Sequence, residues 1–367
     1  MVLGAGGAAA DNYIKSLRLA DPDIYVLGVD THPLMLELSC ATERVCIDTR
    51  PEDEGAHVGT ISDLVKDHGI TLVHAQPDQE ARFLSVGYHG VPVSVPDWNV
   101  IRACQDKLTC AELLGDLAPH SFSYDPYPAR ELAAWDNAGL SNDRPLWMRA
   151  RTGAGSLAAK KVNGFRDIHA WRDTWNPRLK SSDFMLSEYL PGEDRSYTGV
   201  WWRGEPVAAA CRVRVEYADT RTPSGQCSSP RIAKLDSRPE TFDVAEQAIR
   251  RVSDATGTVP HGVFYVDMRE AADGRLLVTE INAGRFNTTQ NFYAEAGLNL
   301  PYVHAALHHE IDGYDEAPVY RLNSFDNDIY WLRQPDMGHK LVIKSKAMAG
   351  VEEVVDSVTW MKDDDGA

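Results

Sequence analysis

The stretch LLVTEINAGRFNTT, residues 276–289, decides the fold. It is a hydrophobic run that ends in a carboxylate and a carboxamide two positions apart. Because successive side chains alternate between the faces of a strand, Glu280 and Asn282 are expected on one face, and Thr279 and Ile281 on the other. One face of this strand therefore presents two side chains that end in oxygen donors.

A second apolar run, GVFYVDM at residues 262–268, precedes this strand. The segment between them contains Asp273-Gly274, a strong signal for a two-residue hairpin turn. Such a turn would pair Asp267 directly with Glu280, with their side chains about 5 Å apart. Two carboxylates at that distance repel each other, so a cation is expected between them.

The donors on this face are all oxygen atoms, from Asp267, Glu280 and Asn282. A set without Cys or His suits Mg²⁺, which keeps coordination positions open for water and phosphate oxygens, and Mn²⁺ is a possible substitute. Taken alone, the hairpin is also consistent with a solvated face on which the two carboxylates repel each other weakly. The rest of the chain decides between these interpretations.

Composition describes a globular protein of 367 residues with a net charge of −17 and a pI of about 5.1. At roughly 100 to 200 residues per domain, two or three domains are expected. The acidic balance argues against nucleic acid as the main partner. No apolar run reaches the ~18 residues of a membrane span, and the amino terminus lacks the features of a signal peptide, so a cytoplasmic protein is expected.

The cysteines and histidines give weaker signals. The six cysteines form no CxxC pair, so reduced and mostly buried thiols are expected. His304 and His308 lie four apart on an expected helix, next to His309 and Glu310. A metal site is conceivable there, but the end of a surface helix is the favoured interpretation.

The first hundred residues alternate between strand and helix patterns, which predicts a parallel, doubly wound sheet. The expected strands cover residues 1–7, 24–30, 70–76 and 91–96, and the expected helices cover about 11–20, 57–68 and 78–87. A further helix is expected at 106–115, with Asp106 as its N-terminal cap and Gly115 as its end.

Strands dominate after residue 145, at 145–150, 157–162, 183–190, 196–202 and 206–215. One amphipathic helix interrupts them at about 239–255, with Phe242, Ala245, Ile249 and Val252 on its apolar side and Gly257 just beyond its end. A helical stretch is expected at 301–310, and the pattern of the tail beyond it is not assigned. This half therefore has α+β character, whereas the first half is α/β.

Two segments could hold a nucleotide, and the first is VLGAGGAAADN near the amino terminus. Gly4, Gly6 and Ala9 fit the GxGxxG/A pattern between a strand and a helix, and Asp30 ends the next strand. This pattern is the basis of one alternative function, an NAD(P)-dependent oxidoreductase. The same glycines are also common where a helix simply packs close to a strand.

The second segment is MRARTGAGSLAAKKV, residues 148–162. Arg149 ends a strand, and Gly153, Gly155 and Ser156 form a glycine-rich loop before the next strand. Such a loop can close over phosphates with its backbone N–H groups, while Arg149 supplies fixed charge. A plain hairpin with a glycine-rich turn is the alternative.

Two further strand ends favour a nucleotide. In SEYLPGED, the backbone of Glu188, Tyr189 and Leu190 can hydrogen-bond an adenine edge, and a carboxylate just after the Pro-Gly turn can bind ribose hydroxyls. In CRVRV, Arg212 and Arg214 lie two apart on a strand and therefore on one face. Two guanidiniums there are costly unless an anion lies between them.

With these motifs in this order, the chain resembles the ATP-grasp superfamily, and within it the carbamoyl-phosphate-synthase-like carboxylate–amine ligases. The resemblance covers roughly residues 1–310. It implies a Rossmann-like pre-ATP-grasp domain at 1–104, followed by a two-lobed ATP-grasp domain. The N-lobe with the glycine-rich flap would cover 105–187, the C-lobe with the magnesium site 188–310, and a C-terminal extension 311–367.

The resemblance also implies roles for single residues. Lys107 and Arg149 would contact ATP phosphates, the loop at Gly153, Gly155 and Ser156 would cover them, and Glu188, Tyr189 and Leu190 would form the adenine hinge. Asp194 would bind the ribose, with Glu193 in reserve. Arg212 would meet the γ-phosphate and acyl phosphate, Asp267, Glu280 and Asn282 would bind magnesium, and Arg285 would follow them as a second catalytic arginine.

One departure concerns Arg285, because the family's EINPR is here EINAGR, one residue longer. The extra residue leaves the direction of Arg285 open. Asp194 also stands where glutamate is commoner, which shortens the reach to the ribose.

The implied reaction joins a small-molecule carboxylate to an amine through an acyl phosphate, with release of ADP and phosphate, in a monomer or homodimer. The substrates would be held by loops at 216–231 and 286–297, where Arg221 and Arg231 could bind a carboxylate or could be ordinary solvated arginines. Besides the oxidoreductase, a nucleotide-binding protein without turnover stays open.

Overall fold

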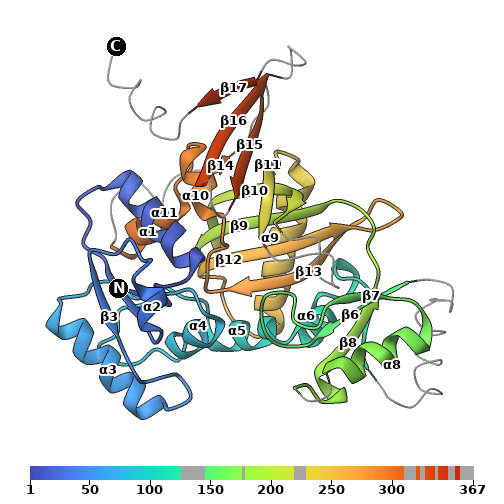
Figure 1. The fold of residues 1–367 in the computed structure, drawn as a ribbon, viewed down its shortest axis with the longest axis horizontal. Helices are drawn as coiled ribbons and strands as arrows, with labels where there is room; N and C mark the ends of the chain where they lie inside the picture. Colours follow the sequence, from blue (N-terminus) through green and yellow to red (C-terminus); the bar gives the residue numbers. More distant parts are fainter. Residues whose placement is uncertain are drawn as a thin grey trace.

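The computed structural model describes residues 1–124, 145–175, 178–218 and 229–309, together with the strand segments 320–322, 327–334, 338–345 and 352–355. These residues form three sheets that lie side by side (Figure 1). The amino-terminal sheet and the small sheet flank a long central one. The described part therefore places the glycine-rich loop and the magnesium-site hairpin on different sheets.

The amino-terminal sheet is parallel, with the strand order β3-β2-β1-β4. Its strands are β1 (Val2–Leu3), β2 (Leu27–Asp30), β3 (Glu43–Cys46) and β4 (His74–Ala75), and its helices are α1 (Ala8–Ala20), α2 (Pro33–Leu36), α3 (Glu54–Asp67) and α4 (Asp78–Leu84). Val2 packs with α1, whereas its neighbour Leu3 packs with α3. Because neighbouring residues face opposite sides, the sheet is covered on both faces, and the predicted doubly wound sheet is confirmed.

Strand β3 was not predicted, because its sequence ERVC is mostly exposed and gives no hydrophobic signal. Conversely, the strand expected at 91–96 is reduced to an isolated bridge between Val73 and Val93. Both errors concern the edges of the sheet, where burial on two faces no longer dictates apolar residues.

The glycine pattern near the amino terminus serves packing within the chain. Gly4 has φ +72°, and a Cβ atom there would lie 2.5 Å from the ring of Pro77. The N–H of Gly6 donates to Asp30 Oδ2 at 2.9 Å. The Gly6 N–H and the Asp30 carboxylate are therefore engaged with each other, while Gly4, Gly7 and Asp30 also line a cavity of about 290 Å³.

The central sheet has the strand order β13-β12-β9-β10-β11-β15-β16-β17, and β14 pairs with β10 in parallel. Its strands are β9 (Asp194–Trp202), β10 (Glu205–Tyr217), β11 (Pro230–Leu235), β12 (Gly262–Glu270), β13 (Leu276–Ala283), β14 (Tyr320–Leu322), β15 (Asn327–Gln334), β16 (Gly338–Ser345) and β17 (Glu352–Val355). The tail that the sequence left unassigned thus extends this sheet as the β15–β16 hairpin.

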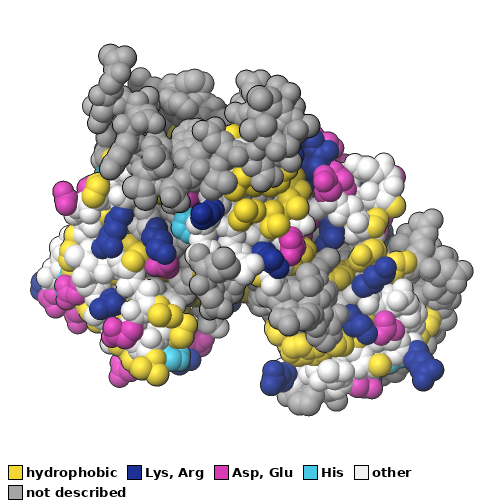
Figure 2. Space-filling view, turned by 45° about the horizontal axis from the view of Figure 1, so that its top comes forward, with side chains coloured by type: hydrophobic (Ala, Val, Ile, Leu, Met, Phe, Trp, Pro, Cys, Tyr) yellow, Lys and Arg dark blue, Asp and Glu magenta, His cyan; other side chains and the backbone are white. Residues whose placement is uncertain are grey.

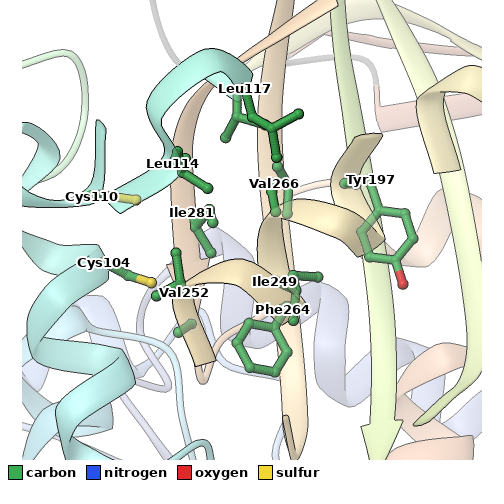
Figure 3. Close-up of a cluster of buried hydrophobic side chains, with 14 of the residues drawn as sticks. Cys104, Cys110, Leu114, Leu117, Tyr197, Ile249, Val252, Phe264, Val266 and Ile281 are labelled. Carbon is green, nitrogen blue, oxygen red and sulfur yellow. The ribbon is translucent and has the colours of Figure 1, made fainter. Parts of the chain in front are cut away.

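One face of the central sheet packs against α5 (Trp98–Gln105), α6 (Lys107–Leu114) and α9 (Pro239–Ala255). Figure 3 shows Ile249 and Val252 of α9 directed at Phe264 and Val266 of β12. The predicted apolar side of α9 is buried, and its predicted bounds agree with the structure. The helix predicted at 106–115 is also confirmed, with Asp106 capping it and Gly115 at its end.

The opposite face changes character along the strands. At one end it packs against α10 (Gln290–Glu295) and α11 (Leu300–His308) through Val200, Ala210 and Val263. Further along, the same faces of β9, β10 and β12 carry polar side chains, which are Asp194, Ser196, Thr198, Arg212, Arg214, Tyr265 and Asp267. This polar half of the face is where a ligand can lie.

The small sheet is antiparallel in the order β5-β8-β6-β7, with β5 (Ser121–Ser123), β6 (Leu146–Ala150), β7 (Lys160–Val162) and β8 (Phe184–Glu188). Helix α8 (Gly164–Trp175) packs against it through Ile168. Two short 3-10 helices, η1 (Gly115–Leu117) and η2 (Ser181–Asp183), complete the described elements. The prediction of a single helix interrupting these strands was wrong, because α8 buries only one narrow stripe and its sequence is largely polar.

The hairpin of β12 and β13 keeps the predicted pairing by an unexpected route. Asp267 does pair with Glu280, but nearer the turn Met268 pairs with Val278, so Thr279 is an extra residue in β13. The turn is also one residue longer than predicted, with Gly274 at φ +86°. The extra residue in the turn and the extra residue in the bulge compensate for each other. The predicted pairing of Asp267 with Glu280 is therefore correct, although the predicted turn was one residue too short.

Two buried histidines make the stability of the protein depend on pH. Burial lowers the pKa of His304 to about 4, and burial, with help from His304 and the terminal amine, lowers the pKa of His74 as well. The unfolded chain therefore binds protons that the folded protein does not, below the usual histidine pKa of about 6.5. We expect the free energy of unfolding to fall by about 3 kcal/mol for His304 as the pH drops from 6.5 to 4.

Urea titrations at several pH values measure this loss, and His304→Gln provides the control. His304 Nε2 bonds the Ser94 carbonyl at 2.8 Å, and glutamine can keep a donor there without titrating. A variant that loses as much stability below pH 6.5 as the parent would contradict the assignment to His304.

Candidate active site

A cavity of about 330 Å³ lies between the small sheet and the polar half of the central sheet. Every residue predicted for the site lines this cavity, except Lys107 and Gly153. Those two line an adjoining cavity of about 430 Å³, which shares Glu280 and Asn282 with the first. The structure therefore brings together residues that are up to 178 positions apart in sequence, from Lys107 to Arg285.

The three predicted magnesium ligands lie on one wall of the cavity. A side-chain oxygen of each is in contact with a cationic side chain. Arg214 lies 3.0 Å from Asp267 Oδ1, and Lys107 Nζ lies 3.2 Å from Glu280 Oε1. Arg285 donates to Asn282 Oδ1. The repulsion expected between Asp267 and Glu280 is thus offset by side chains of the protein itself.

The pKa values of the Glu280 and Asp267 carboxyl groups are shifted in opposite directions. Burial would raise the pKa of Glu280, but Lys107, Arg149 and Arg285 outweigh it, and the pKa is lowered. Burial raises the pKa of Asp267 despite Arg214, and the nearby negative charges of Asp194 and Glu280 add to the rise.

The bulge in β13 changes the prediction for Thr279. This residue was expected on the face opposite to Glu280, but the extra residue turns it toward the cavity. Its carbonyl, freed from the regular pairing, accepts a hydrogen bond from Arg149 at 2.7 Å. The bulge thereby provides a contact between β6 of the small sheet and β13 of the central sheet.

Lys107 takes its position from the first turn of α6. Asp106 caps that helix and is also paired with Arg151, at 2.6 Å. Lys107 Nζ donates to the Gly153 carbonyl at 2.7 Å as well as meeting Glu280. The lysine therefore connects the glycine-rich loop with the acidic wall.

The glycine-rich loop follows its predicted pattern of strand, loop and strand. Gly153 and Gly155 have φ values of +95° and +69°, and Ser156 also has a positive φ of +57°. Left-handed backbone is costly for a serine, so the conformation is imposed by the surrounding loop. Gly155 and Ser156 line the same cavity as Arg149.

Arg212 and Arg214 share a face as predicted, but their surroundings differ. Arg214 is paired with Asp194 at 3.2 Å and with Asp267 at 3.0 Å, so carboxylates of the protein itself supply the negative charge expected beside this residue. Arg212 is 1 % exposed and bonds only the hydroxyls of Ser196 and Tyr265. Among the residues that the structure describes, no carboxylate lies within ion-pair distance of it.

Asp194 and Glu193 point in different directions, which bears on the ribose contact. Asp194 lines the cavity and bonds Tyr217 and Arg214. Glu193 is 58 % exposed and pairs with Arg195 and Arg238 away from the cavity. Of the two, Asp194 is the one that lines the cavity, as its predicted role as ribose ligand requires.

If ATP binds as the family resemblance implies, Asp194→Asn should raise the KM for ATP about tenfold or more, because hydrogen bonds to a charged group are worth about 1.5–3 kcal/mol. Glu193→Gln is the matched control and should leave this KM unchanged. Initial rates over a range of ATP concentrations distinguish the two. A larger effect at Glu193 would reverse the assignment.

The predicted adenine hinge, residues 188–190, forms the end of the cavity nearest the small sheet. The Glu188 N–H bonds the His120 carbonyl at 2.9 Å, which fixes where β8 ends. Tyr189 lies under Lys161, whose Nζ is 4.4 Å from the ring centroid, and near Trp147. Leu190, Trp147 and Met268 give this end the apolar walls that a flat base requires.

Arg285 is directed into the cavity by the residue that lengthens the motif. Gly284 has φ +86°, and a Cβ atom there would lie 3.1 Å from Ile101. The turn at this glycine brings Arg285 back beside Asn282, while its Nε lies 2.5 Å from Asp78 Oδ1 of α4. The EINAGR spacing therefore still places the arginine in the cavity.

The donor set fits magnesium by its chemistry. All three side chains end in oxygen, two are acidic, and they share one wall of the cavity. Within the described ranges, no group of three or more His, Cys, Asp or Glu side chains could hold a metal ion. A metal here would therefore need Asn282 and oxygens from a bound phosphate to complete its coordination.

The conceivable histidine site is not formed. His304 bonds the Ser94 carbonyl, and His308 bonds the Thr71 carbonyl at 3.0 Å. Glu310 lies outside the described residues. The described cysteines form no disulfide with one another; Cys104, Cys110 and Cys211 are buried, Cys40 is half-buried and Cys46 is exposed.

Several cavity residues were not predicted. Tyr265 bonds Asp267 at 2.5 Å, and Trp147 and Met268 line the cavity. Tyr265 could have been found from the alternation that placed Asp267, since it lies two residues earlier on the same face. The others depend on which strands become neighbours, which the local sequence does not reveal.

The predicted substrate loops are described in part. Residues 286–297 contribute Asn287 and Thr288 to the cavity, but 290–295 form helix α10. Arg221 lies outside the described residues. Arg231 is exposed and pairs with Glu216 at 3.2 Å, so the interpretation as an ordinary surface arginine fits it better.

Two features of the outer surface bear on partners. On the face drawn in Figure 2, basic and acidic side chains are interspersed rather than gathered by sign. No described helix has the length and apolar character needed to cross a membrane.

Several solved structures of other proteins have a fold similar to that of this chain. No protein-family model and no curated protein matches the sequence. An N5-carboxyaminoimidazole synthetase from Staphylococcus aureus, complexed with ADP, is similar over 90 % of this chain and 80 % of its own, with 15 % identity and a TM-score of 0.64.

Two other solved structures are similar to the same extent. The biotin carboxylase domain of a Hydrogenobacter thermophilus 2-oxoglutarate carboxylase, with MgADP and bicarbonate, matches 90 % of this chain and 73 % of its own at 13 % identity and a TM-score of 0.65. A carboxyaminoimidazole ribonucleotide synthase from Aspergillus clavatus, complexed with ATP, covers 90 % and 81 % at 16 % identity and a TM-score of 0.63. These likenesses concern the fold, and the expected architecture is confirmed at that level.

Proposed function

We propose that this chain, which has the ATP-grasp fold, is an ATP-dependent ligase that joins a carboxylate to an amine. One observation carries the proposal. On a single face of the central sheet, Glu280, Asp267, Ser196 and Arg212 lie in a row on four neighbouring strands. At about 4.8 Å per strand, roughly 10 Å separates the backbone of Arg212 from that of Asp267.

This row supports binding of a triphosphate with a divalent cation. A buried guanidinium without a carboxylate partner at one end and two carboxylates at the other give anion and cation sites on the same wall. The apolar walls at Leu190 and Met268 and the carboxylate of Asp194 lie toward the small sheet, where a base and a ribose would fit. ATP-bound and ADP-bound neighbours of the same fold support this choice of nucleotide.

The proposed chemistry needs no nucleophilic side chain. A carboxylate oxygen of the substrate attacks the γ-phosphorus of ATP, the bond to the β–γ bridging oxygen breaks, and ADP leaves. The amine nitrogen then attacks the acyl carbon, loses a proton, and displaces phosphate. Lys107, Arg149, Arg212 and Arg285 would hold the transferring oxygens in line and offset their charge.

Asp267, Glu280 and Asn282 would hold magnesium, which when bound neutralises β- and γ-phosphate oxygens. Binding there requires Arg214, Lys107 and Arg285 to release the donor oxygens that they now contact. The loop at Gly153 and Gly155 would close over the phosphates and exclude water, which otherwise hydrolyses an acyl phosphate.

The test is a screen for ADP release with pairs of amino acids and small acids as substrates, followed by the product mass for each pair that reacts. A product heavier than the acid by the mass of the amine, less one water, identifies the new amide bond. ADP release that no combination of acid and amine stimulates, in a protein that binds MgATP, would favour a nucleotide-binding protein without ligase turnover.

A further inference from the structure

A third arginine approaches the cavity from the hairpin at the carboxyl end of the chain. Strand β15 pairs with β11, which pairs with β10, so that Arg214, Ala233 and Trp331 lie in a row on the face that bears the site. Arg333 is two residues beyond Trp331 on β15 and therefore points from the same face. The hairpin thus adds a guanidinium to the face that already carries Arg212 and Arg214.

The side chain of Arg333 is held in place by backbone carbonyls. Its Nε donates to the Pro230 carbonyl at 2.7 Å, and one terminal nitrogen donates to the Thr288 carbonyl at 3.3 Å. Thr288 lines the cavity, and its hydroxyl bonds Ser229 at 3.2 Å. Two acceptors fix the plane of the guanidinium and leave the second terminal nitrogen without an acceptor among the described residues.

Among the described residues, the guanidinium of Arg333 meets the ring of Trp331, 5.4 Å from its centroid, but no negative charge. No carboxylate of the described residues lies within ion-pair distance, although the chain carries 54 acidic residues and 37 basic ones. Burial, together with the charges of Arg212 and Arg214, lowers the pKa of Arg333 to about 10. Three guanidiniums gathered on one face, two of them without a carboxylate, are costly unless a ligand brings negative charge.

The phosphates of ATP do not account for all of this charge. Arg212 lies in the row with Asp267 and Glu280, where a triphosphate is proposed, whereas Arg333 lies beyond β11 and beside Thr288. We propose that Arg333 binds a second oxyanion, a carboxylate or a phosphate carried by the substrate in addition to its reacting group. This inference rests on the proposed ligase function and narrows its substrate class.

The consequence is a bifunctional substrate. One end of the molecule reacts at the nucleotide, and the other is anchored by the hairpin next to Thr288. A dicarboxylic acid, an amino acid that uses its α-carboxylate as the anchor, or a phosphorylated metabolite satisfies this requirement, and a simple monocarboxylic acid with a neutral amine does not.

A binding experiment tests the subsite without turnover. The full-length protein with magnesium and a non-hydrolysable ATP analogue is titrated with inorganic phosphate and, separately, with succinate, by calorimetry. We expect at least one of the two anions to bind, and Arg333→Met to weaken it at least tenfold, about 1.4 kcal/mol. The anion that binds more tightly indicates whether the second group of the substrate is a phosphate or a carboxylate.

Arg231→Met is the matched control, because this exposed arginine on the neighbouring strand pairs with Glu216. It should leave anion binding unchanged, and equal binding in wild type and Arg333→Met would overturn the inference. Thermal melts show whether each variant is folded, and Arg333→Lys, which keeps the charge, should retain part of the affinity if the first variant proves unstable.

Kinetics separates this inference from the proposed function. For a productive substrate, Arg333→Met should raise its KM at least tenfold while the KM for ATP and kcat change little. A substrate that lacks the second anionic group should have a higher KM with the wild type and an unchanged KM with Arg333→Met. No ADP release with any acid would reject the ligase, whereas a good substrate without a second anion would reject only the role of Arg333.

Discussion

Glu280→Gln is expected to lower kcat for ADP release about 10³-fold, equivalent to about 4 kcal/mol of lost transition-state stabilisation. Glutamine has the shape of glutamate but removes the negative charge from the centre of the acidic wall. Glu280 is the carboxylate whose pKa the surrounding cations lower, so it is the one that stays ionised most readily. Its charge is what a divalent ion beside the phosphates would need.

The measurement is kcat at saturating ATP, together with the magnesium concentration that gives half the maximal rate. Asp273→Asn, an acid-to-amide change at the exposed turn of the same hairpin, is the control and should leave both values unchanged. A Glu280→Gln variant with unaltered kcat and metal dependence would exclude the proposed metal site.

Arg212→Met should lower kcat about 10²–10³-fold and at the same time make the ligand-free protein more stable. The rate falls because a fixed positive charge no longer faces the transferring phosphoryl group. Stability rises, by about 1–3 kcal/mol, because methionine removes a buried charge that has no carboxylate partner among the described residues. A substitution that raises stability and lowers activity identifies a residue whose role is to bind the ligand.

Initial rates measure the loss of kcat, and denaturant titration without nucleotide measures the gain in stability. Arg212→Lys keeps the charge, so it should recover part of the activity and gain little or no stability. A stability loss of several kcal/mol in Arg212→Met would mean that the guanidinium has a structural partner, and the role as an anion site would then fail.

Much of the fold follows from local sequence. Helix α9 was predicted at its bounds because Pro239, an apolar stripe and Gly257 all agree. The amino-terminal sheet followed from alternating strand and helix patterns. Helix α8 was missed because its sequence is largely polar. The β15–β16 hairpin was left unassigned although Trp331 and Leu341 are buried, since that burial comes from neighbours that the sequence does not identify.

Site residues could be predicted where a charged or amide side chain stands at the end of a hydrophobic strand. Carboxylates, an amide and arginines at strand ends are conspicuous, and the structure gathers them at one cavity. Lys107 and Arg285 came only from the family resemblance, because nothing local separates them from surface residues. The pairing of Arg214 with Asp194 and Asp267 depends on cross-strand register, which is settled only when the whole sheet forms.

The extra residue at Thr279 has a consequence for how such chains can diverge. The turn at Asp273 and the bulge shift the two strands by equal and opposite amounts, and only their combination leaves Asp267 facing Glu280. Deleting one residue from the turn alone would shift β13 by one position and direct Glu280 and Asn282 toward the hydrophobic face, while Asp267 stays in register with Ser196 of β9. Homologous chains should therefore gain or lose a residue at both places together, so that indels in this hairpin are inherited as pairs.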